Sequence, residues 1–100
     1  MVEVLFRTRQ LQRNYEESTR AAQQWGADVG RKYITRIEQL YAVKGLQQAY
    51  SIRSMRLHPL KGSRKRDLSI YLTGKWRLIV EEGDTEEQVI VKEVSNHYDD

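Results

Sequence analysis

The spacing of the hydrophobic residues changes twice along this 100-residue chain, and these changes constrain the fold more than any other feature. Residues 2–6 form a short apolar run that is typical of a strand. From there to Lys44 the apolar residues recur every three or four positions, which is the spacing of one face of an α-helix. From Leu68 onward the period becomes two, as in a strand with one buried face. The sequence therefore predicts one strand, then helices, then a sheet.

A long helix is expected over residues 27–43, after a shorter helix that Thr8 can cap. Gly45 ends the long helix, and residues 46–65 are expected to form a loop or short irregular turns. The apolar stripe of the helical region fits a buried face, so its aromatic residues are interpreted as core and not as a platform for stacking bases. The stripe consists of Trp25, Val29, Tyr33, Ile37, Leu40 and Tyr41.

Three further strands are expected over residues 68–72, 76–80 and 88–94, joined by a turn at Thr73 and Gly74 and by a polar loop around Gly83. Together with residues 2–6 they predict a small α+β fold in which helices pack on one face of an antiparallel sheet. The other face is expected to be open to solvent and concave, with Lys75 and Arg77 on it beside the loop that holds His58 and Lys61. A chain of this length supports one modest core, so residues 1–100 are expected to form a single domain.

Composition excludes several classes of protein. The chain has no cysteine, which rules out disulfides, thiolate metal sites and thiol catalysis. No stretch approaches the roughly 20 apolar residues of a membrane span, and the first residues lack the apolar centre of a secretory signal. A cytoplasmic protein without membrane contact is the simplest interpretation.

Positive charge is concentrated in one segment of the chain. The formal net charge is +3, but residues 53–77 hold eight cationic side chains against one acid, Asp67. Residues 81–100 hold eight acids and one base, Lys92. Such separation favours a basic face for nucleic acid beside an acidic flank. The eight cationic residues are Arg53, Arg56, Lys61, Arg64, Lys65, Arg66, Lys75 and Arg77.

The side chains in and after this segment favour phosphate chemistry on RNA without a metal ion. Metal-dependent phosphodiester cleavage requires clustered carboxylates, which the basic segment lacks, and two histidines alone cannot hold zinc. In RNA the 2′-hydroxyl is an internal nucleophile, which needs a base, cations to stabilise the phosphorane and an acid for the 5′-oxygen. The side chains of the right type are His58, Lys61, Arg77, His97 and Tyr98.

Three motifs, in this order, resemble the HigB-type (plasmid maintenance killer) toxins of the RelE superfamily. They are Arg-Leu-His-Pro-Leu-Lys-Gly at residues 56–62, Leu-Ser-Ile followed by Thr-Gly-Lys-Trp-Arg-Leu at residues 68–78, and Glu-Val-Ser-Asn-His-Tyr at residues 93–98. The opening run at residues 4–8 and the helix with Trp25-Gly26 and Arg36-Ile37 fit as well. The similarity therefore spans nearly the whole chain.

The resemblance implies a RelE-like, microbial-ribonuclease-like fold and cleavage of messenger RNA on the translating ribosome, with contacts to 16S and 23S ribosomal RNA. It also implies a HigA-like helix-turn-helix antitoxin as partner, and no cofactor or metal. Family members place a histidine and a lysine in the loop motif, matching His58 and Lys61, and an arginine on the next strand, matching Arg77. They commonly end in Asp-Tyr-His, where this chain has Asn96-His97-Tyr98, so either His97 or Tyr98 can serve the scissile phosphate.

Two functions from different classes stay open. In the first, the protein is a metal-independent endoribonuclease in which Lys61 and Arg77 stabilise the phosphorane and His58 exchanges protons with His97 or Tyr98. In the second, a catalytically weak module of the same fold binds RNA or only the antitoxin, because the C-terminal triplet is altered. In both, the other basic residues are expected to hold the RNA backbone, although such clusters often only solvate a loop. These residues are Arg53, Arg56, Arg64, Lys65, Arg66 and Lys75.

Overall fold

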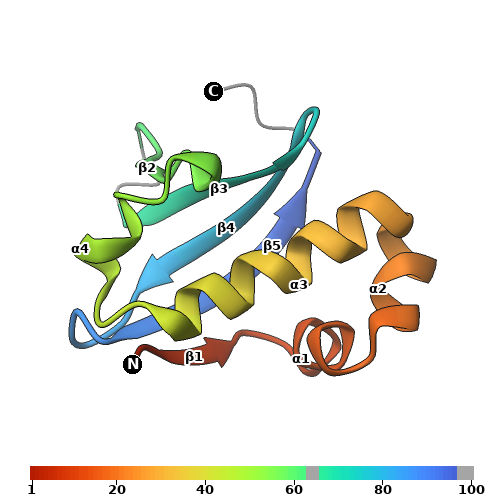
Figure 1. Cartoon of the computed structure of the whole chain (residues 1–100), viewed down its shortest axis with the longest axis horizontal. Coiled ribbons are helices and arrows are strands. Elements are labelled where there is room, and N and C mark those ends of the chain that lie inside the picture. The colour runs from red at the N-terminus through yellow and green to blue at the C-terminus, as the bar shows by residue number, and fades with distance from the viewer. Residues whose placement is uncertain (63–65, 97–100) are drawn as a thin grey trace.

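The computed structural model describes residues 1–62 and 66–96, which form one five-stranded sheet and a layer of helices on one of its faces (Figure 1). The strand order in the sheet is β1-β5-β4-β3-β2. In chain order the elements are β1 (Glu3–Phe6), α1 (Arg9–Glu16), α2 (Ser18–Trp25), α3 (Ala27–Ala42), α4 (Leu46–Ala49), the 3₁₀ helix η1 (Arg53–Met55), β2 (His58–Pro59), β3 (Asp67–Thr73), β4 (Trp76–Glu82) and β5 (Gln88–Ser95).

The sheet confirms the predicted strands and adds one. β3, β4 and β5 form an antiparallel meander, and Gly74 allows the turn between β3 and β4 because it adopts a positive φ of 55°. β1 lies at the edge beyond β5 and pairs with it in parallel. The added strand, β2, falls in the segment that the sequence predicts to be irregular, and it pairs with β3 at the other edge. Its second residue is Pro59, which lacks an N–H donor and suits an edge position.

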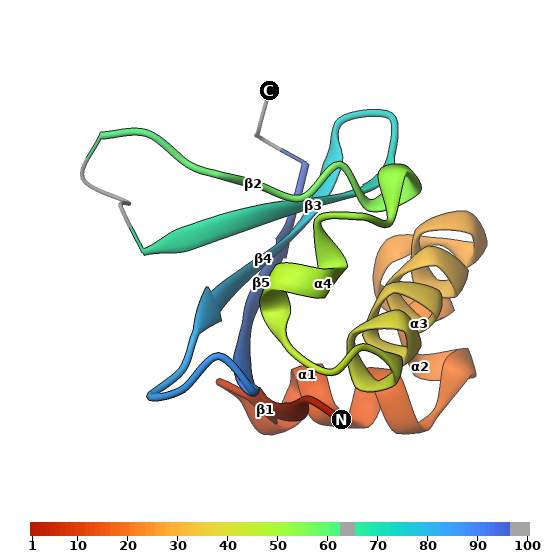
Figure 2. The same ribbon diagram turned by 60° about the vertical axis from the view of Figure 1, so that its left-hand side comes forward.

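The helices cover one face of the sheet, and α3 crosses it (Figures 1 and 2). The boundaries of α3 agree with the predicted helix, and Thr8 caps α1 by accepting a hydrogen bond from Leu11 N at 3.2 Å. Tyr33 and Ile37 of α3 are fully buried in the core, as predicted. Gly30 lets α2 and α3 approach closely, since a Cβ there would lie 2.9 Å from Ala22 N.

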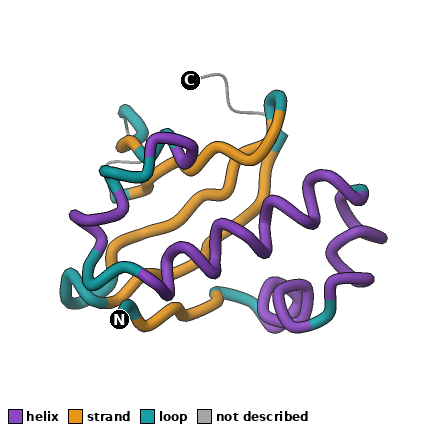
Figure 3. Tube along the Cα trace, in the orientation of Figure 1, coloured by secondary structure: helices purple, strands orange, loops and turns teal. Residues whose placement is uncertain are grey.

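The face of the sheet turned away from the helices differs from the prediction, because it is buried at its centre. Core residues alternate along β3 and β4 with outward residues, as the period of two predicts. Ser69 and Ile79, two of the outward residues, have no exposed surface, and Arg77 is only 7% exposed. The tube in Figure 3 shows the strands as one layer with no second sheet stacked on it.

No helix among the described residues is both long enough and apolar enough to cross a membrane.

The buried hydroxyl of Tyr33 predicts a pH dependence of stability. It donates a hydrogen bond to Leu11 O at 2.7 Å, and burial raises the pKa of Tyr33 well above its ordinary value of 10.0. The unfolded chain then ionises first, so the free energy of unfolding should be level below about pH 10 and fall above it. Urea denaturation at a series of pH values measures this.

The variant Tyr33→Phe separates the two effects of the hydroxyl. Its free energy of unfolding should be about 1 kcal/mol lower at neutral pH because the hydrogen bond is missing. Most of the decrease of this free energy above about pH 10 should disappear. Burial is also the main cause that raises the pKa of Tyr15, so a weaker decrease of the free energy of unfolding above about pH 10 should remain in this variant. An unchanged alkaline slope in Tyr33→Phe would contradict this assignment.

Candidate functional site

The register of the sheet brings His58 and Arg77 to the same face. Residues paired across strands project to the same side, so each pairing row shares one face. One row contains His58, Ser69, Ile79 and Glu93, and the next contains Tyr71, Arg77 and Ser95. Successive rows lie about 7 Å apart along the strands. His58 and Arg77 are therefore one row and two strands apart, with Tyr71 between them.

Tyr71 holds two guanidinium groups against its ring. The guanidinium carbon of Arg56 lies 4.4 Å from the ring centroid, and that of Arg77 lies 4.8 Å from it. Each contact of this kind contributes about 0.5–1 kcal/mol at an exposed site and more where water is excluded. The Tyr71 hydroxyl accepts a hydrogen bond from Gly74 N at 3.1 Å, which fixes the ring to the β3–β4 turn.

Arg77 is held in one direction by the main chain of the same turn. Its Nη1 donates to Gly74 O at 2.7 Å and to Trp76 O at 2.9 Å. A guanidinium carries five N–H donors in a rigid fork, so fixing Nη1 fixes the direction of the others. Arg77 lies on the outward face as predicted, but it is more buried than a residue of an open face.

Arg56 orients His58 through its backbone. Arg56 has a left-handed conformation with φ of 48°, which a side chain with a Cβ rarely adopts. In this conformation its carbonyl oxygen lies 2.7 Å from Nδ1 of His58. A carbonyl only accepts, so Nδ1 carries the proton and Nε2 holds the lone pair of the neutral ring. This is the tautomer in which Nε2 can act as a base.

Arg36 ties the segment that carries Arg56 to the rest of the fold. Its Nε donates to Tyr71 O at 2.8 Å, and its Nη2 donates to Ser54 O at 2.9 Å. Its Nη1 donates to Gln39 Oε1 at 3.0 Å. Burial lowers the pKa of Arg36 from its ordinary value, yet a guanidinium stays charged at neutral pH. One buried side chain thus joins α3, β3 and η1.

An ionic cluster occupies the other end of the same face. Asp67 and Glu81 pair directly across β3 and β4, and two adjacent carboxylates repel one another. Lys92 of β5 offsets this repulsion, with Nζ 2.8 Å from Asp67 Oδ1 and 3.7 Å from Glu81 Oε1. The one acid of the basic segment is therefore ion-paired. Within residues 1–62 and 66–96, no three carboxylate or histidine side chains are grouped so that they could hold a metal ion.

Lys61 and Lys75 lie at opposite ends of β3. Lys61 is exposed in the β2–β3 connection, beyond the hydrogen bond from Leu60 N to Asp67 O at 2.9 Å. It is separated from the Arg77 row by five residues of strand, about 17 Å. Lys75 is exposed in the β3–β4 turn. The structure therefore groups Arg56 and Arg77 around the Tyr71 ring, with His58 in the next row of the same face, and leaves the two lysines at the borders of this group.

The other predicted basic residues lie outside this group. Arg53 is exposed at the start of η1. Arg66 lines a cavity of about 250 Å³ together with Leu46 and Tyr50, near α4 and away from the Arg77 row. Four further predicted site residues lie outside the described residues, namely Arg64, Lys65, His97 and Tyr98.

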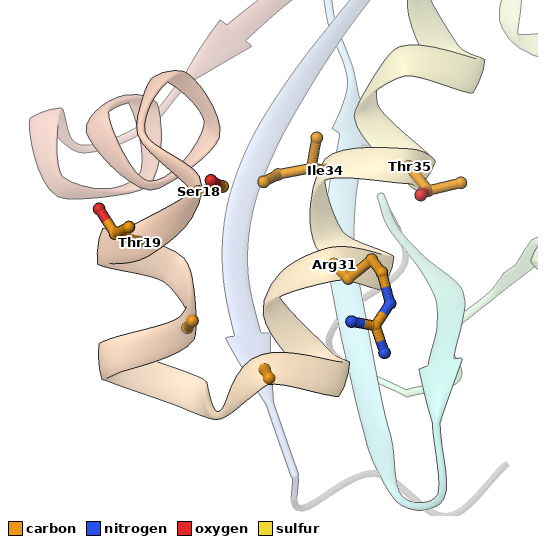
Figure 4. Close-up of a pocket in the computed structure, with 7 residues that line it drawn as sticks. Ser18, Thr19, Arg31, Ile34 and Thr35 are labelled. Atoms are coloured by element: carbon orange, nitrogen blue, oxygen red, sulfur yellow. The ribbon is translucent and has the colours of Figure 1, made fainter.

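A second cavity, of about 440 Å³, lies between α2 and α3 (Figure 4). It belongs to the helical layer and not to the face with Tyr71. Its lining is mainly apolar and consists of Ser18, Thr19, Ala22, Ala27, Arg31, Ile34 and Thr35.

Tyr71 and Arg36 are parts of the site that the sequence does not single out. For Tyr71 the sequence indicates only that it lies in a strand with a period of two. Its position opposite Arg77 across a short turn is a usable signal, because aromatic residues and arginines pair across strands. The contacts of Arg36 span 18 and 35 positions along the chain, and no local pattern predicts them.

Comparisons with known proteins identify the fold. No family model and no curated protein matches the chain. Among solved structures, a YoeB/ParE toxin from Agrobacterium tumefaciens is similar, with 19% identity, a TM-score of 0.58, and coverage of 97% of this chain and 100% of that one. YafQ from E. coli is also similar, with 14% identity, a TM-score of 0.60 and coverage of 97% and 94%. The chain therefore has the fold of these proteins, which confirms the predicted RelE-like α+β fold.

The role of Arg36 can be tested with a conservative substitution. Arg36→Lys keeps the charge but loses the fork that reaches Tyr71 and Ser54 together, so the unfolding free energy should fall by about 2–4 kcal/mol. Thermal unfolding measures the loss. Arg31→Lys is the matched control, since Arg31 is an exposed residue of the same helix, and it should change stability by less than about 0.5 kcal/mol. Equal stability of both variants would show that Arg36 does not hold η1 to β3.

Proposed function

We propose that this protein is the toxin of a type II toxin–antitoxin pair and cleaves messenger RNA on the ribosome without a metal ion. A fold shared with a YoeB/ParE toxin and with YafQ supports the toxin class. The HigB-like motifs favour the HigB type within that class, with a HigA-like helix-turn-helix antitoxin as partner. Ribosomal RNA contacts and a cytoplasmic location follow from the same proposal.

The proposed reaction is an internal transfer of the RNA phosphodiester. His58 Nε2 takes the proton of the 2′-hydroxyl, and the 2′-oxygen attacks the adjacent phosphorus. Arg77 stabilises the charge of the phosphorane, and Lys61, exposed in the β2–β3 connection, adds positive charge from the border of the site. The bond to the 5′-oxygen breaks, and His97 or Tyr98 donates the proton that this oxygen needs. The products are a 2′,3′-cyclic phosphate and a 5′-hydroxyl.

The orientation of His58 on the same face as a fixed Arg77 is the observation that carries this proposal. The 2.7 Å contact of Nδ1 with Arg56 O leaves the lone pair on Nε2, as a base requires. The two hydrogen bonds from Arg77 Nη1 to the β3–β4 turn hold a cation on the same face before any substrate binds. Preorganised charge is the main means by which a protein stabilises a phosphorane.

Ribosome-bound messenger RNA tests the proposal. The purified protein should cut mRNA in the A site of translating ribosomes. His58→Ala should lower the rate about 10²–10⁴-fold through loss of the base, and Arg77→Ala about 10²–10³-fold through loss of charge stabilisation. Arg20→Ala removes an exposed arginine from α2 in the helical layer and should cut at the wild-type rate. If saturating wild-type protein leaves the mRNA intact, the endoribonuclease proposal is wrong, and the alternative of a binding module with the same fold is left.

The chemistry of the cut ends tests the mechanism separately. Internal attack should leave 5′-hydroxyl ends that polynucleotide kinase labels without prior phosphatase treatment. A 2′-O-methyl group on the nucleotide 5′ of the cut should block cleavage there. Ends that carry a 5′-phosphate, or cleavage past the methyl group, would show that water attacks the phosphorus instead.

A further inference from the structure

Two arginines from distant parts of the chain meet at Tyr71. Arg77 is its direct partner across β3 and β4, and the β2–β3 register, continued by two pairs, places Arg56 opposite Tyr71 on the other side. β2 and β4 flank β3, so the two guanidinium groups approach the ring from opposite neighbours. Their carbons are at most about 9 Å apart, which is the sum of the two distances to the ring centroid, 4.4 and 4.8 Å.

This arrangement concentrates positive charge. Two like charges on an uncharged ring raise the local potential, and an anion bound to both relieves the repulsion. Arg56 is exposed, and none of the carboxylates in residues 1–62 and 66–96 forms an ion pair with it. Of the acids on the same face, Asp67 and Glu81 are neutralised by Lys92 at its far end, and Glu93 lies in the row of His58.

The backbone at Arg56 does not account for an arginine there. A φ of 48° favours glycine, for which this conformation carries no steric cost. The carbonyl that orients His58 belongs to the main chain, so any residue with the same backbone conformation would supply it. The side chain of Arg56 therefore needs a separate explanation, and its contact with Tyr71 indicates one.

We propose that Arg56 and Arg77, positioned by Tyr71, bind two successive phosphates of one RNA strand. Arg77 holds the scissile phosphate, and Arg56, two residues before His58, holds the neighbouring phosphate. Tyr71 is a positioning residue that keeps the two guanidinium groups one nucleotide step apart. This inference rests on the proposed function for its substrate class, and it adds a second phosphate site to the single scissile phosphate.

Binding of a single-stranded 2′-O-methyl oligoribonucleotide, which the proposed reaction cannot cleave, tests the paired site. Fluorescence anisotropy over a series of KCl concentrations gives the affinity and its salt dependence. Arg56→Gly keeps the favoured backbone and the carbonyl but removes the guanidinium. It should weaken binding about tenfold and reduce the slope of log K against log salt by about 0.7, the value for one phosphate of a single strand.

Two variants of Tyr71 test the positioning role. Tyr71→Phe keeps the ring but loses the hydroxyl that accepts from Gly74 N, so it should weaken RNA binding less than Arg56→Gly does. Tyr71→Leu removes the ring and should weaken binding at least as much as Arg56→Gly. In the Tyr71→Leu background, Arg56→Gly should have a smaller effect than alone, because residues that act as one unit are not additive. Arg20→Ala serves as the control for loss of one exposed arginine and should keep the wild-type salt slope.

Several results would overturn the paired site. One is that Arg56→Gly binds RNA with the affinity and the salt dependence of the wild-type protein. The others are that Tyr71→Leu binds as tightly as wild type, or that the wild-type protein does not bind RNA at low salt. Circular dichroism and thermal unfolding verify that each variant is folded. If RNA binding depends on Arg56 but the wild-type protein never cuts ribosome-bound mRNA, the proposed function is refuted and the paired site is still supported. Normal cleavage by Arg56→Gly with an unchanged KM would refute only the paired site.

Discussion

The site depends on the pairing of β3 with a strand on each side. Because β3 lies between β2 and β4, its outward residues meet partners from two different segments of the chain. Ser69 meets His58 on one side, and Tyr71 meets Arg77 on the other. A shift of either register by one residue would turn these side chains into the helical core. Arg36 reinforces this register from the helical layer, because it binds Tyr71 O and Ser54 O with one guanidinium.

Along this face the net charge changes from positive at the Tyr71 row to nearly neutral at the Asp67 row. The Tyr71 row carries two guanidinium groups, whereas the Asp67 row carries two carboxylates with Lys92 between them. A polyanion that crosses the strands along the Tyr71 row is therefore attracted to that row and would find little net charge at the Asp67 row. The histidine row, which also contains Glu93, lies between the two, so His58 borders the cationic row.

The sequence predicted the fold through its periodicity and the site only in part. The period of two located β3, β4 and β5 and placed Arg77 on the outward face, and the helical stripe located α3 and the burial of Tyr33. β2 was missed because two residues are too short for a periodic signal. The charge count also treated all basic residues alike, although Arg66 lies near α4 and Arg56 stacks on Tyr71. These differences depend on contacts between segments, which a linear charge count does not contain.

RNA is expected to lie on the face of the sheet around Tyr71. A structure of the protein on a ribosome, with mRNA that carries 2′-O-methyl groups, would show where the RNA lies. One phosphate should lie at the Arg77 guanidinium, the next at that of Arg56, and the 2′-oxygen of the blocked nucleotide beside His58 Nε2. An RNA strand that instead follows the helical layer, or the cavity between α2 and α3, would contradict this expectation.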